Sequence, residues 1–497
     1  MAKLQPENFS DFHRQCTEGN VVPVIRTLAA DLITPFGAYL RLAQTSENAF
    51  LLESVEGGER LARYSFLGSE PEMIARGTGD KTILERNGST ETLQTRLPDF
   101  LREYFRTKKL ASNAECPPFS GGAVGFFGFN AVRWFEPALA KNNFSDDSDI
   151  AAFMFFRTVV AFDHARQQIS VISLVFTDEV GKEGGRLNDL YDNAVAETER
   201  IARNLEQNPI LIESLPPEEN SGYVSNWKPE EFEEGVRRIK EYILSGDCYQ
   251  AVLSQRFSKK TTASPESIYR ALRRLNPSPY LFLLRMGEKS IIGASPEMLI
   301  KCRGKQVEYR PIAGTRPRGA SEKDDDRLAE EMRADEKEVA EHMMLVDLGR
   351  NDLGRVAKYG SVSIEKLMTI EKYSHVQHLV SSLSAELRPD VDRFDALAAC
   401  FPAGTVTGAP KVRAMQIIEE LEPDERGVYS GAVGYIDYAG NLDTCIAIRT
   451  LWLENGVANV QAGAGIVADS VPAREYEETV NKAQAVLRAI EMAETDS

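Results

Sequence analysis

Apolar positions along the chain form short runs in some stretches and follow helical spacing in others. Short apolar runs between turn residues predict strands at 36–42, 49–54 and 159–163 in the first third. Similar runs later in the chain predict strands at 251–257, 281–285, 290–293, 431–438, 443–453 and 457–462. Helical spacing predicts a segment ending near residue 207, an amphipathic helix at 230–244, one long helix at 323–348 and a final helix at 472–493.

Tight turns connect the predicted strands, as between Asp437 and Leu442, and favour antiparallel pairing over regular strand–helix–strand alternation. The sequence has no fixed-period repeat, no P-loop and no GxGxxG motif in a strand–helix setting. The expected class is therefore α+β, with large antiparallel β-sheets and helices packed outside them. A polar, acidic stretch divides the chain, so we expect an N-terminal lobe at 22–176, a connector at 177–227 and a second domain at 228–493.

Composition narrows the class of protein further. The 497 residues are 42% hydrophobic and 27% charged, which is enough apolar material for a large buried core. No apolar run reaches membrane-spanning length and the first residues lack a signal-peptide core, so we expect a cytoplasmic protein without a membrane partner. The six cysteines are scattered without paired spacing, which is typical of reduced thiols rather than of disulfides or a zinc site.

The net charge of −17 limits the possible ligands. It argues against nucleic-acid binding, which needs basic patches. It also gives no general attraction for an acidic metabolite. An anionic ligand must therefore be bound locally, by arginine, lysine, backbone N–H groups or a metal ion.

The strongest local candidate for such binding is the segment 462–482. Its first residues, 462–466, are predicted to form a small-residue loop whose backbone N–H groups can approach an anion closely. The predicted helix that follows has Glu475, Glu478 and Lys482 on one face, where carboxylates suit a hard cation and the ammonium suits an acid. An ordinary turn followed by a surface ion pair is the alternative explanation.

The long predicted helix carries a second acidic pair, Glu338 and Glu341, away from its apolar stripe. A solvated helix face is the alternative explanation. The apolar residues at 342–348, however, predict a buried helix end, where carboxylates need a cation. Two such pairs on two helices match the needs of a carboxylate substrate bridged by Mg²⁺. The residues expected in the apolar stripe are Leu328, Met332, Val339, Met343 and Val346.

The second half of the chain contains long motifs: PIAGTRPRG at 311–319, DEKEVAEHMMLVDLGRNDL at 335–353, HVQHL at 375–379, FPAGTVTGAPK at 401–411, YSGAVG at 429–434 and AGAGI at 462–466. In this order, the motifs resemble those of the chorismate-utilising enzymes. A similarity to one branch of the family, the large subunits of anthranilate synthases, is carried by LLESVEGG at 51–58, RYSFLG at 63–68 and NPSPY at 276–280. The resemblance covers nearly the whole chain and implies that the sheets pack as a sandwich.

The resemblance implies that chorismate and ammonia give anthranilate and pyruvate with Mg²⁺, the first committed step of tryptophan biosynthesis. By the family's motifs, Glu341 and Glu478 are the metal ligands, with Glu338 and Glu475 close by. Three further residues carry expected catalytic roles: Glu297 as general acid, Thr405 as a partner of the same ring hydroxyl, and His378 in the loss of pyruvate. The expected substrate-binding set is Gly314, Thr315, Tyr429, Arg449, Gly463, Ala464, Gly465 and Lys482.

Two positions bear on the alternatives within the family. The aminodeoxychorismate branch has a nucleophilic lysine where this chain has Ala313. Isochorismate and salicylate synthases have a lysine base where this chain has Gln250. Both residues favour amination to anthranilate. Aminodeoxychorismate synthase or another chorismate-utilising enzyme is the alternative activity, and a catalytically silent tryptophan-sensing protein is the alternative from a different class.

The resemblance also implies a regulator and a partner. In the anthranilate branch, tryptophan acts as a feedback inhibitor in a pocket between two motifs, represented here by Glu53, Ser54, Pro279, Tyr280 and Leu281. The chain has no Gly-x-Cys-x-Gly nucleophile motif, so glutamine-derived ammonia requires a separate glutamine amidotransferase subunit. The expected assembly is a heterotetramer of two large and two small subunits.

Overall fold

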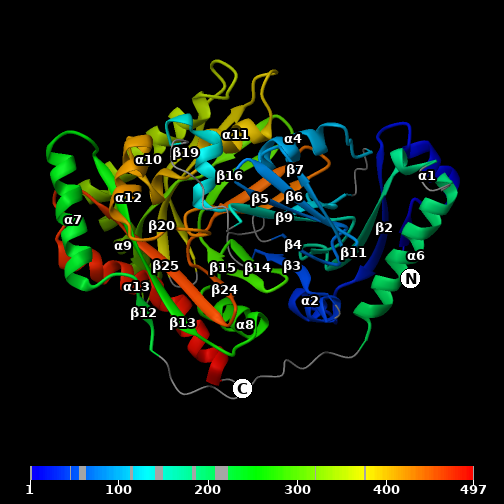
Figure 1. Ribbon diagram of the computed structural model, residues 1–497, viewed down its shortest axis with the longest axis horizontal. Helices are drawn as coiled ribbons and strands as arrows, with labels where there is room; N and C mark the ends of the chain where they lie inside the picture. The colour runs from blue at the N-terminus through cyan, green and yellow to red at the C-terminus, as the bar shows by residue number, and fades with distance from the viewer. Residues whose placement is uncertain are drawn as a thin grey trace.

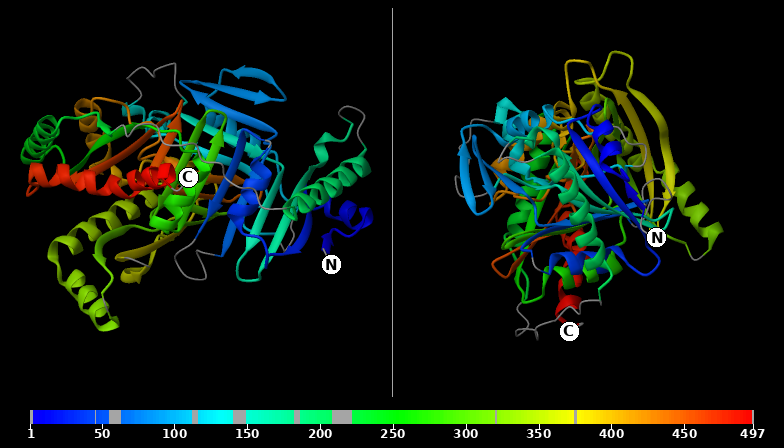
Figure 2. Two further views of the ribbon diagram at one scale, coloured as in Figure 1. Left: turned by 90° about the horizontal axis from the view of Figure 1, so that it is seen from below. Right: turned by 90° about the vertical axis from the view of Figure 1, so that its right-hand side faces the viewer.

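The computed structural model describes residues 3–44, 46–54, 63–111, 116–139, 149–181, 186–207, 222–319, 321–373 and 376–495. Two large antiparallel sheets face each other, with helices on their outer surfaces (Figures 1 and 2). Apolar side chains from both facing surfaces, among them Phe50, Phe155 and Ile300, form one core between the sheets. The predicted α+β class and the sandwich of large antiparallel sheets are confirmed.

Within the described residues the first sheet has 13 strands and the second has 12. The first sheet contains β1 (Lys3–Gln5), β2 (Val21–Ala29), β3 (Asn48–Glu53), β4 (Tyr64–Ser69), β10 (Thr158–Asp163), β11 (Gln168–Phe176), β12 (Val224–Ser225), β13 (Gln250–Lys260), β14 (Tyr280–Met286), β15 (Lys289–Ser295), β21 (Gly408–Ala409), β24 (Thr450–Glu454) and β25 (Val457–Ile466). The second contains β5 (Met73–Thr78), β6 (Lys81–Arg86), β7 (Ser89–Leu93), β8 (Gly122–Phe127), β9 (Ala151–Phe156), β16 (Met298–Arg303), β17 (Gln306–Tyr309), β18 (Ile312–Pro317), β19 (Ser363–Lys372), β20 (Val376–Glu386), β22 (Ala432–Asp437) and β23 (Leu442–Ile446).

The α-helices lie outside or at the ends of the sheets. They are α1 (Phe9–Gln15), α2 (Pro35–Ala43), α4 (Leu97–Arg106), α5 (Val132–Phe135), α6 (Leu187–Leu205), α7 (Pro229–Leu244), α8 (Pro265–Leu275), α9 (Glu322–Ala334), α10 (Glu336–Gly354), α11 (Arg393–Cys400), α12 (Lys411–Leu421) and α13 (Pro472–Thr495). The predicted helices at 230–244 and 472–493, and the helical segment ending near residue 207, are confirmed by α7, α13 and α6.

Alternate residues of β14 point to opposite faces of the first sheet. Phe282 and Leu284 enter the core between the sheets, whereas Leu281 and Leu283 belong to a second apolar cluster on the outer face. Helices α2, α8 and α13 pack on that outer face, in the lower part of Figure 1. Both faces of the central strands are therefore buried, which explains why β14 is a continuous apolar run rather than an alternating one.

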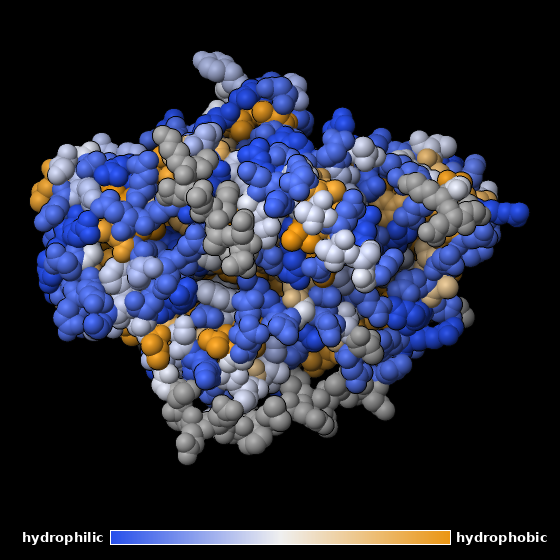
Figure 3. Space-filling model, in the orientation of Figure 1, coloured by the Kyte–Doolittle hydropathy of each residue, from blue (hydrophilic) through white to orange (hydrophobic). Residues whose placement is uncertain are grey.

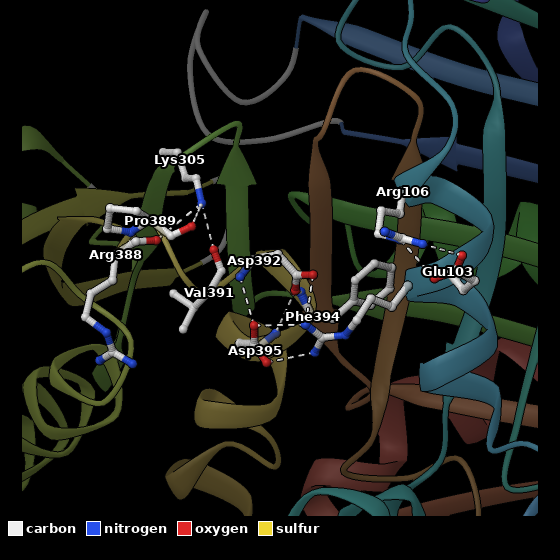
Figure 4. A network of polar contacts seen from close by, with 10 residues as sticks. Glu103, Arg106, Lys305, Arg388, Pro389, Val391, Asp392, Phe394 and Asp395 are labelled. Atoms are coloured by element: carbon white, nitrogen blue, oxygen red, sulfur yellow. Dashed lines mark hydrogen bonds and ion pairs between the residues drawn. The ribbon is translucent and has the colours of Figure 1, made fainter.

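Each sheet joins a block of strands from the first half of the chain to a block of strands from the second half. In the first sheet β3 pairs with β14, and in the second β8 pairs with β22. Outside the sheets, Arg102 of α4 donates to Asp392 and Asp395 at distances from 2.7 to 3.0 Å. Figure 4 shows these two aspartates at the start of α11. The two predicted lobes therefore share their sheets. Residues 208–221 of the predicted connector lie outside the described part of the chain.

The prediction of a strand at 36–42 is wrong, because these residues lie in α2. The local sequence provides the helix with both of its starting signals. Thr34 caps the first turn by accepting a hydrogen bond from Gly37 N at 3.1 Å, and Pro35 occupies the first helical position. These helix-start signals outweighed the strand preference of the apolar run. Its residues pack on β3 and β4 from outside the sheet.

Two further predicted elements are each divided in the structure. The helix predicted at 323–348 is two helices, because Asp335 ends α9 and its carboxylate caps α10 by accepting from Lys337 N and Glu338 N. As a result Met343, predicted for the apolar stripe, is 40% exposed. The strand predicted at 443–453 is also two strands, β23 and β24, which belong to different sheets.

The surface in the view of Figure 3 is dominated by hydrophilic side chains, and the apolar residues visible there form small separate patches. This distribution agrees with the strongly acidic composition. None of the described helices is long and apolar enough to cross a membrane. The six cysteines, all within the described ranges, form no disulfide, and Cys248, Cys302, Cys400 and Cys445 are buried.

Candidate active site

Two neighbouring connections carry the chain from one sheet of the sandwich to the other. One links β15 to β16 and contains Glu297, and the other links β23 to β24 and contains Arg449. Backbone hydrogen bonds tie them together, from Ile446 N to Glu297 O at 3.0 Å and from Ala294 N to Arg449 O at 3.1 Å. Arg449 has a φ of 51°, a left-handed conformation that is costly for a residue with a side chain. The fold thus fixes an acid and a cation side by side where the sheets are joined.

A cavity of about 340 Å³ opens beside these connections. Its walls come from the two connections, from β13, β18, β20 and β25, from the 3₁₀ turn η5 (Gly404–Val406), and from α10 and α13. Most of the residues predicted for the site line this one cavity: Glu297, Gly314, Thr315, Glu341, His378, Thr405, Tyr429, Arg449, Gly463, Gly465, Glu475, Glu478 and Lys482. Two predicted residues, Glu338 and Ala464, do not line it.

Glu297 is held in an unusual state for a carboxyl group. The residue is 7% exposed, and burial raises its pKa to about 8, against smaller opposing effects of Thr405 and Lys482. The Thr405 hydroxyl is itself buried and, among the described residues, lacks a hydrogen-bond partner of normal geometry. At neutral pH the Glu297 carboxyl is therefore mostly protonated and able to donate a proton to a ligand in the cavity.

The edge of β25 beside the cavity presents backbone groups that have no strand partner. Gly463 and Gly465 lie opposite Ser254 and Val252 of β13, and those two residues direct their N–H groups away from β25. In an antiparallel ladder, two residues that lie opposite each other either both point their backbone groups at the partner strand or both point them away from it. Gly463 and Gly465 therefore point theirs away from β13. The neighbouring strand on the other side, β24, reaches only as far as Val460. The N–H groups of both glycines therefore point to an open edge next to the cavity.

Side chains at these two glycines would collide with residues that line the cavity. A Cβ at Gly463 would lie 2.8 Å from the Tyr429 hydroxyl, and one at Gly465 would collide with the Gln250 amide. The open side also holds Lys482, whose Nζ donates to Gly463 O at 3.0 Å. The segment predicted as an anion-binding loop is therefore a strand edge. The intervening Ala464 packs its side chain into an apolar cluster on the other face of β25, which explains its absence from the cavity.

Helices α10 and α13 contribute acidic residues to the same cavity. Glu341 comes from α10, while Glu475, Glu478 and Lys482 lie along one face of α13, as their spacing predicted. Lys482 Nζ forms an ion pair with Glu478 at 2.7 Å. Burial raises the pKa of Glu341 and of Glu475, and neighbouring carboxylates raise both pKa values further. A cation bound among these carboxylates would therefore be stabilised.

The donor set suits a hard metal ion only if a ligand completes it. Glu338 does not line the cavity and accepts a hydrogen bond from Arg316 Nη1 at 2.9 Å, and Arg316 also pairs with Asp335. In the described parts of the chain, no three His, Cys, Asp or Glu side chains are arranged to hold a metal by themselves. Glu341 and Glu478, from two helices, fit an ion such as Mg²⁺, which keeps waters and shares ligands with its substrate.

A bulge in β18 orients His378. Gly314 has a φ of 63° and interrupts the register with β20, so that its carbonyl oxygen lies 3.0 Å from His378 Nδ1. Thr315 Oγ1 lies 3.1 Å from the same nitrogen. Because a carbonyl only accepts, Nδ1 carries the proton of the neutral ring and Nε2 is the basic nitrogen. The ring also packs edge-on against Tyr373, with centroids 5.5 Å apart.

A second cavity, of about 100 Å³, lies between the two sheets. Its lining includes every residue predicted for an inhibitor pocket: Glu53, Ser54, Pro279, Tyr280 and Leu281. The Ser54 hydroxyl is buried and has no hydrogen-bond partner among the described residues. Strand β14, which forms one wall, pairs with β15 through Tyr280 and Ser295, two residues before Glu297. The two cavities are thus joined by a single hairpin.

The first cavity, beside Glu297 and Arg449, also contains residues that the sequence patterns did not identify. Lys337 lies one turn before Glu341 on α10, and Gln461 lies two residues before Gly463 on the same face of β25. Both residues can be identified once the element type is known, because helix residues four apart and strand residues two apart lie on the same face. Because residues 462–466 were predicted to be a loop, the two-residue repeat of a strand was not applied to them, and Gln461 was not identified.

Comparison with known proteins defines the class. The family model described as "chorismate binding enzyme" matches residues 34–488. The chain therefore belongs to the chorismate binding enzymes. The menaquinone-specific isochorismate synthase of Escherichia coli shares the fold, with a TM-score of 0.68 at 20% identity over 96% of this chain and 97% of that chain.

Nearer relatives locate the chain within this family. It is 46% identical to anthranilate synthase component 1 of Acetivibrio thermocellus, over 95% of this chain and 96% of that protein. It is 44% identical to the Aquifex aeolicus protein of the same name, over 96% of each. The crystal structure of anthranilate synthase component I from Streptococcus pneumoniae TIGR4 matches with a TM-score of 0.75 at 36% identity, over 92% of this chain and 98% of that chain. The chain is an enzyme of the anthranilate synthase component 1 family.

Proposed function

We propose that this enzyme converts chorismate and ammonia to anthranilate, pyruvate and water, using Mg²⁺ and ammonia from a glutamine amidotransferase subunit. The observation that carries the proposal is a buried carboxyl group, Glu297, whose pKa burial raises to about 8, in the same cavity as Arg449 and the open edge of β25. A proton for a departing hydroxyl thus lies beside a binding site for a carboxylate. Family membership supports the same reaction.

Chorismate carries two carboxylates, and the cavity offers two ways to hold them. Arg449 can bind both oxygens of one carboxylate through its planar fork, next to the outward N–H groups of Gly463 and Gly465. Glu341 and Glu478 are the proposed ligands of Mg²⁺, with Glu475 beside them. When bound, Mg²⁺ supplies positive charge that fixes the second carboxylate and offsets the repulsion between the glutamates.

The residues of the chain then divide the proton transfers between two steps. Ammonia forms a bond to C2 of the ring, the double bonds shift, and the C4 hydroxyl leaves as water with the proton of Glu297. The ammonium group formed at C2 then loses one proton to become the amine, which balances the proton that Glu297 gave up. Thr405, next to Glu297, is the proposed hydrogen-bond partner of that hydroxyl. In the second step His378 Nε2 accepts the proton from C2 while the C3–oxygen bond breaks. The ring becomes aromatic, and the released enolpyruvate is protonated to pyruvate.

The decisive test is a fluorescence assay with the purified chain, chorismate, an ammonium salt and Mg²⁺. The proposal requires anthranilate fluorescence that depends on all three additions. Chromatography of the product distinguishes anthranilate from 4-amino-4-deoxychorismate, the product of the alternative activity. Ala313, which lines the cavity and cannot act as a nucleophile, favours anthranilate. Tryptophan binding without any product would identify a silent sensor instead.

The source of nitrogen gives a further prediction. The isolated chain should use ammonium salts, with a rate that rises with pH as more ammonia is unprotonated, and should not use glutamine alone. Addition of a matching glutamine amidotransferase subunit should give glutamine-dependent activity, as part of the expected assembly of two large and two small subunits. The measurement is anthranilate formation with each nitrogen source. Glutamine-dependent activity of the pure single chain would contradict the proposed partner.

The second cavity supports regulation by tryptophan. Tyr280, Leu281 and Pro279 provide apolar surface for an indole, and Ser54 brings an unsatisfied hydroxyl for a polar anchor. Glu53 accepts hydrogen bonds from the Tyr269 hydroxyl and from Arg273. Its proposed role is to stabilise the wall of the pocket or to bind the ammonium group of tryptophan. Inhibition from a separate cavity requires two conformations that differ in chorismate affinity.

Ser54→Phe should relieve tryptophan inhibition with little change in the uninhibited rate, because an aromatic ring fills the space offered to the indole. The readout is the tryptophan concentration that halves anthranilate formation, which should rise by at least about tenfold, equivalent to ~1.4 kcal/mol of lost binding. Ser89→Phe, the same change on the exposed strand β7, serves as the matched control. Equal inhibition of Ser54→Phe and the control would move the effector site elsewhere.

A further inference from the structure

Lys337 is an exposed cation in the lining of the first cavity. It lies on α10, one turn before Glu341. Within the described ranges its ammonium group forms no ion pair and no hydrogen bond. The other two cations of the lining have fixed partners, because Lys482 pairs with Glu478 at 2.7 Å and Arg449 donates to Lys482 O at 2.5 Å. Among the described cavity residues, Lys337 is therefore the cation without a fixed partner.

The charge of Lys337 reaches carboxylates on two helices. Burial raises the pKa of Glu341 on α10 and of Glu475 on α13, and the positive charge of Lys337 opposes the rise at both. Glu475 lies one turn before Glu478 on α13. Lys337 is therefore close to the proposed metal site, whose ligands are Glu341 and Glu478.

Lys337 completes a balance of charge in the cavity. Apart from Glu297, which is mostly protonated at neutral pH, the lining contains three carboxylates and three cations. These are Glu341, Glu475 and Glu478 against Lys337, Arg449 and Lys482. Without Lys337 the empty cavity would have an excess of negative charge, in a protein whose net charge is already −17.

One positive charge has opposite effects on the two ligands of the proposed reaction. It repels a divalent cation and attracts chorismate, which carries two carboxylates. Once chorismate is bound, its negative charge offsets the repulsion and its oxygens add to the ligands of the metal ion. A cation at the position of Lys337 therefore favours binding of the substrate before binding of the metal.

We propose that Lys337 lowers the affinity of the empty cavity for the metal ion and raises its affinity for chorismate, so that the substrate enters first. This inference rests on the proposed function and gives a role to a residue outside both proposed ligand sets. Lys337 acts through its charge and not through contact with the reacting atoms. An arginine should therefore replace it, whereas a neutral side chain should not.

The first test measures metal binding without substrate in Lys337→Met, which removes the charge and keeps an unbranched side chain. The probe is Mn²⁺, which shares the preference of Mg²⁺ for carboxylate oxygens and whose free concentration is read by electron paramagnetic resonance. Binding that Glu341→Ala abolishes defines the cavity site. Its dissociation constant should fall roughly two- to fivefold in Lys337→Met, and the difference should shrink at high salt.

The second test measures chorismate binding by equilibrium dialysis in metal-free buffer, where no turnover occurs. The dissociation constant should rise roughly two- to fivefold in Lys337→Met. Lys337→Arg should keep the parent values in both tests. Lys323→Met is the matched control, because Lys323 is exposed on the neighbouring helix α9 and lies outside the cavity.

Opposite changes in the two dissociation constants support the inference. Unchanged Mn²⁺ binding in Lys337→Met overturns it, and so does weaker binding of both ligands, which is the result expected if Lys337 only shapes the cavity. If the parent binds both ligands but makes no anthranilate, the proposed function fails while the two titrations still decide this inference. If no variant binds either ligand, both fail. Lys337→Gln replaces Lys337→Met if thermal melting shows that the methionine variant is unfolded.

Discussion

Alanine in place of Glu341 or of Glu478 is expected to reduce anthranilate formation by more than about 100-fold while leaving the fold intact. Each change removes a proposed direct Mg²⁺ ligand, and even residues that only support metal ligands cost roughly 10–100-fold when they are replaced. Both side chains border the cavity rather than the core, so the loss should not come from unfolding. The measurement is turnover at saturating chorismate across a Mg²⁺ titration, with thermal melting as the test of folding.

Matched controls exist on the same two helices. Glu336 of α10 and Glu477 of α13 are exposed and do not line the cavity, so their replacement by alanine changes the helix charge without touching the site. These two variants should keep nearly the parent rate. Near-normal turnover of Glu341→Ala or Glu478→Ala at ordinary Mg²⁺ would show that the assignment of ligands is wrong.

Glu297→Gln should lower turnover by about 10²–10⁴-fold, the usual contribution of a positioned general acid. The amide has the same shape but cannot give a proton to the departing hydroxyl. In the parent, the pKa of Glu297 is raised to about 8, so the protonated form is lost as the pH passes through about 8. The rate at a constant concentration of unprotonated ammonia should therefore fall above that pH. The residual activity of Glu297→Gln should lack this fall.

The same substitution should change how stability depends on pH. The pKa of Glu297 is raised in the folded protein from its ordinary value of 4.5, so its protonated form contributes stability that is complete below about 4.5 and is lost as the pH rises through about 8. Glu297→Gln removes that dependence, so the melting temperatures of the two proteins should diverge in favour of the variant between these pH values. A constant difference would mean that Glu297 is ionised in the cavity.

The sequence predicted which residues line the cavity better than it predicted how they are arranged. The glutamates and lysine of α13 were identifiable from helical spacing alone, and the motifs supplied Glu297, Arg449 and His378. Local sequence patterns could not reveal that Glu297 and Arg449 lie in neighbouring connections between the sheets. That arrangement depends on pairing between strands that are distant in the sequence, β15 with β24 and β16 with β23. The error at Asp335 had a local cause, since one aspartate both ends a helix and begins the next.

Gln461 was missed for a related reason. In the sequence it precedes a run of small residues that reads as a loop, and in the structure that run is the end of a strand. Its side-chain partner, Ser254, comes from the neighbouring strand β13, and Glu422, which accepts from Ser254, lies at the end of α12. A buried unsatisfied oxygen is a property of the packed protein, so no residue pattern could have indicated it.

Because both sheets are built from strands of both halves of the chain, synthesis of the protein delays their completion. Strand β8 needs β22 as its neighbour, and Phe127 meets Ala432 only after roughly 300 further residues have been synthesised. At about 5–20 residues per second, translation of that stretch takes roughly 15–60 s, during which apolar strands of the N-terminal half are without their final partners. Because such distant pairings also fold slowly, the nascent chain is a natural client for chaperones. Fragments cut between the halves should depend on each other to become soluble.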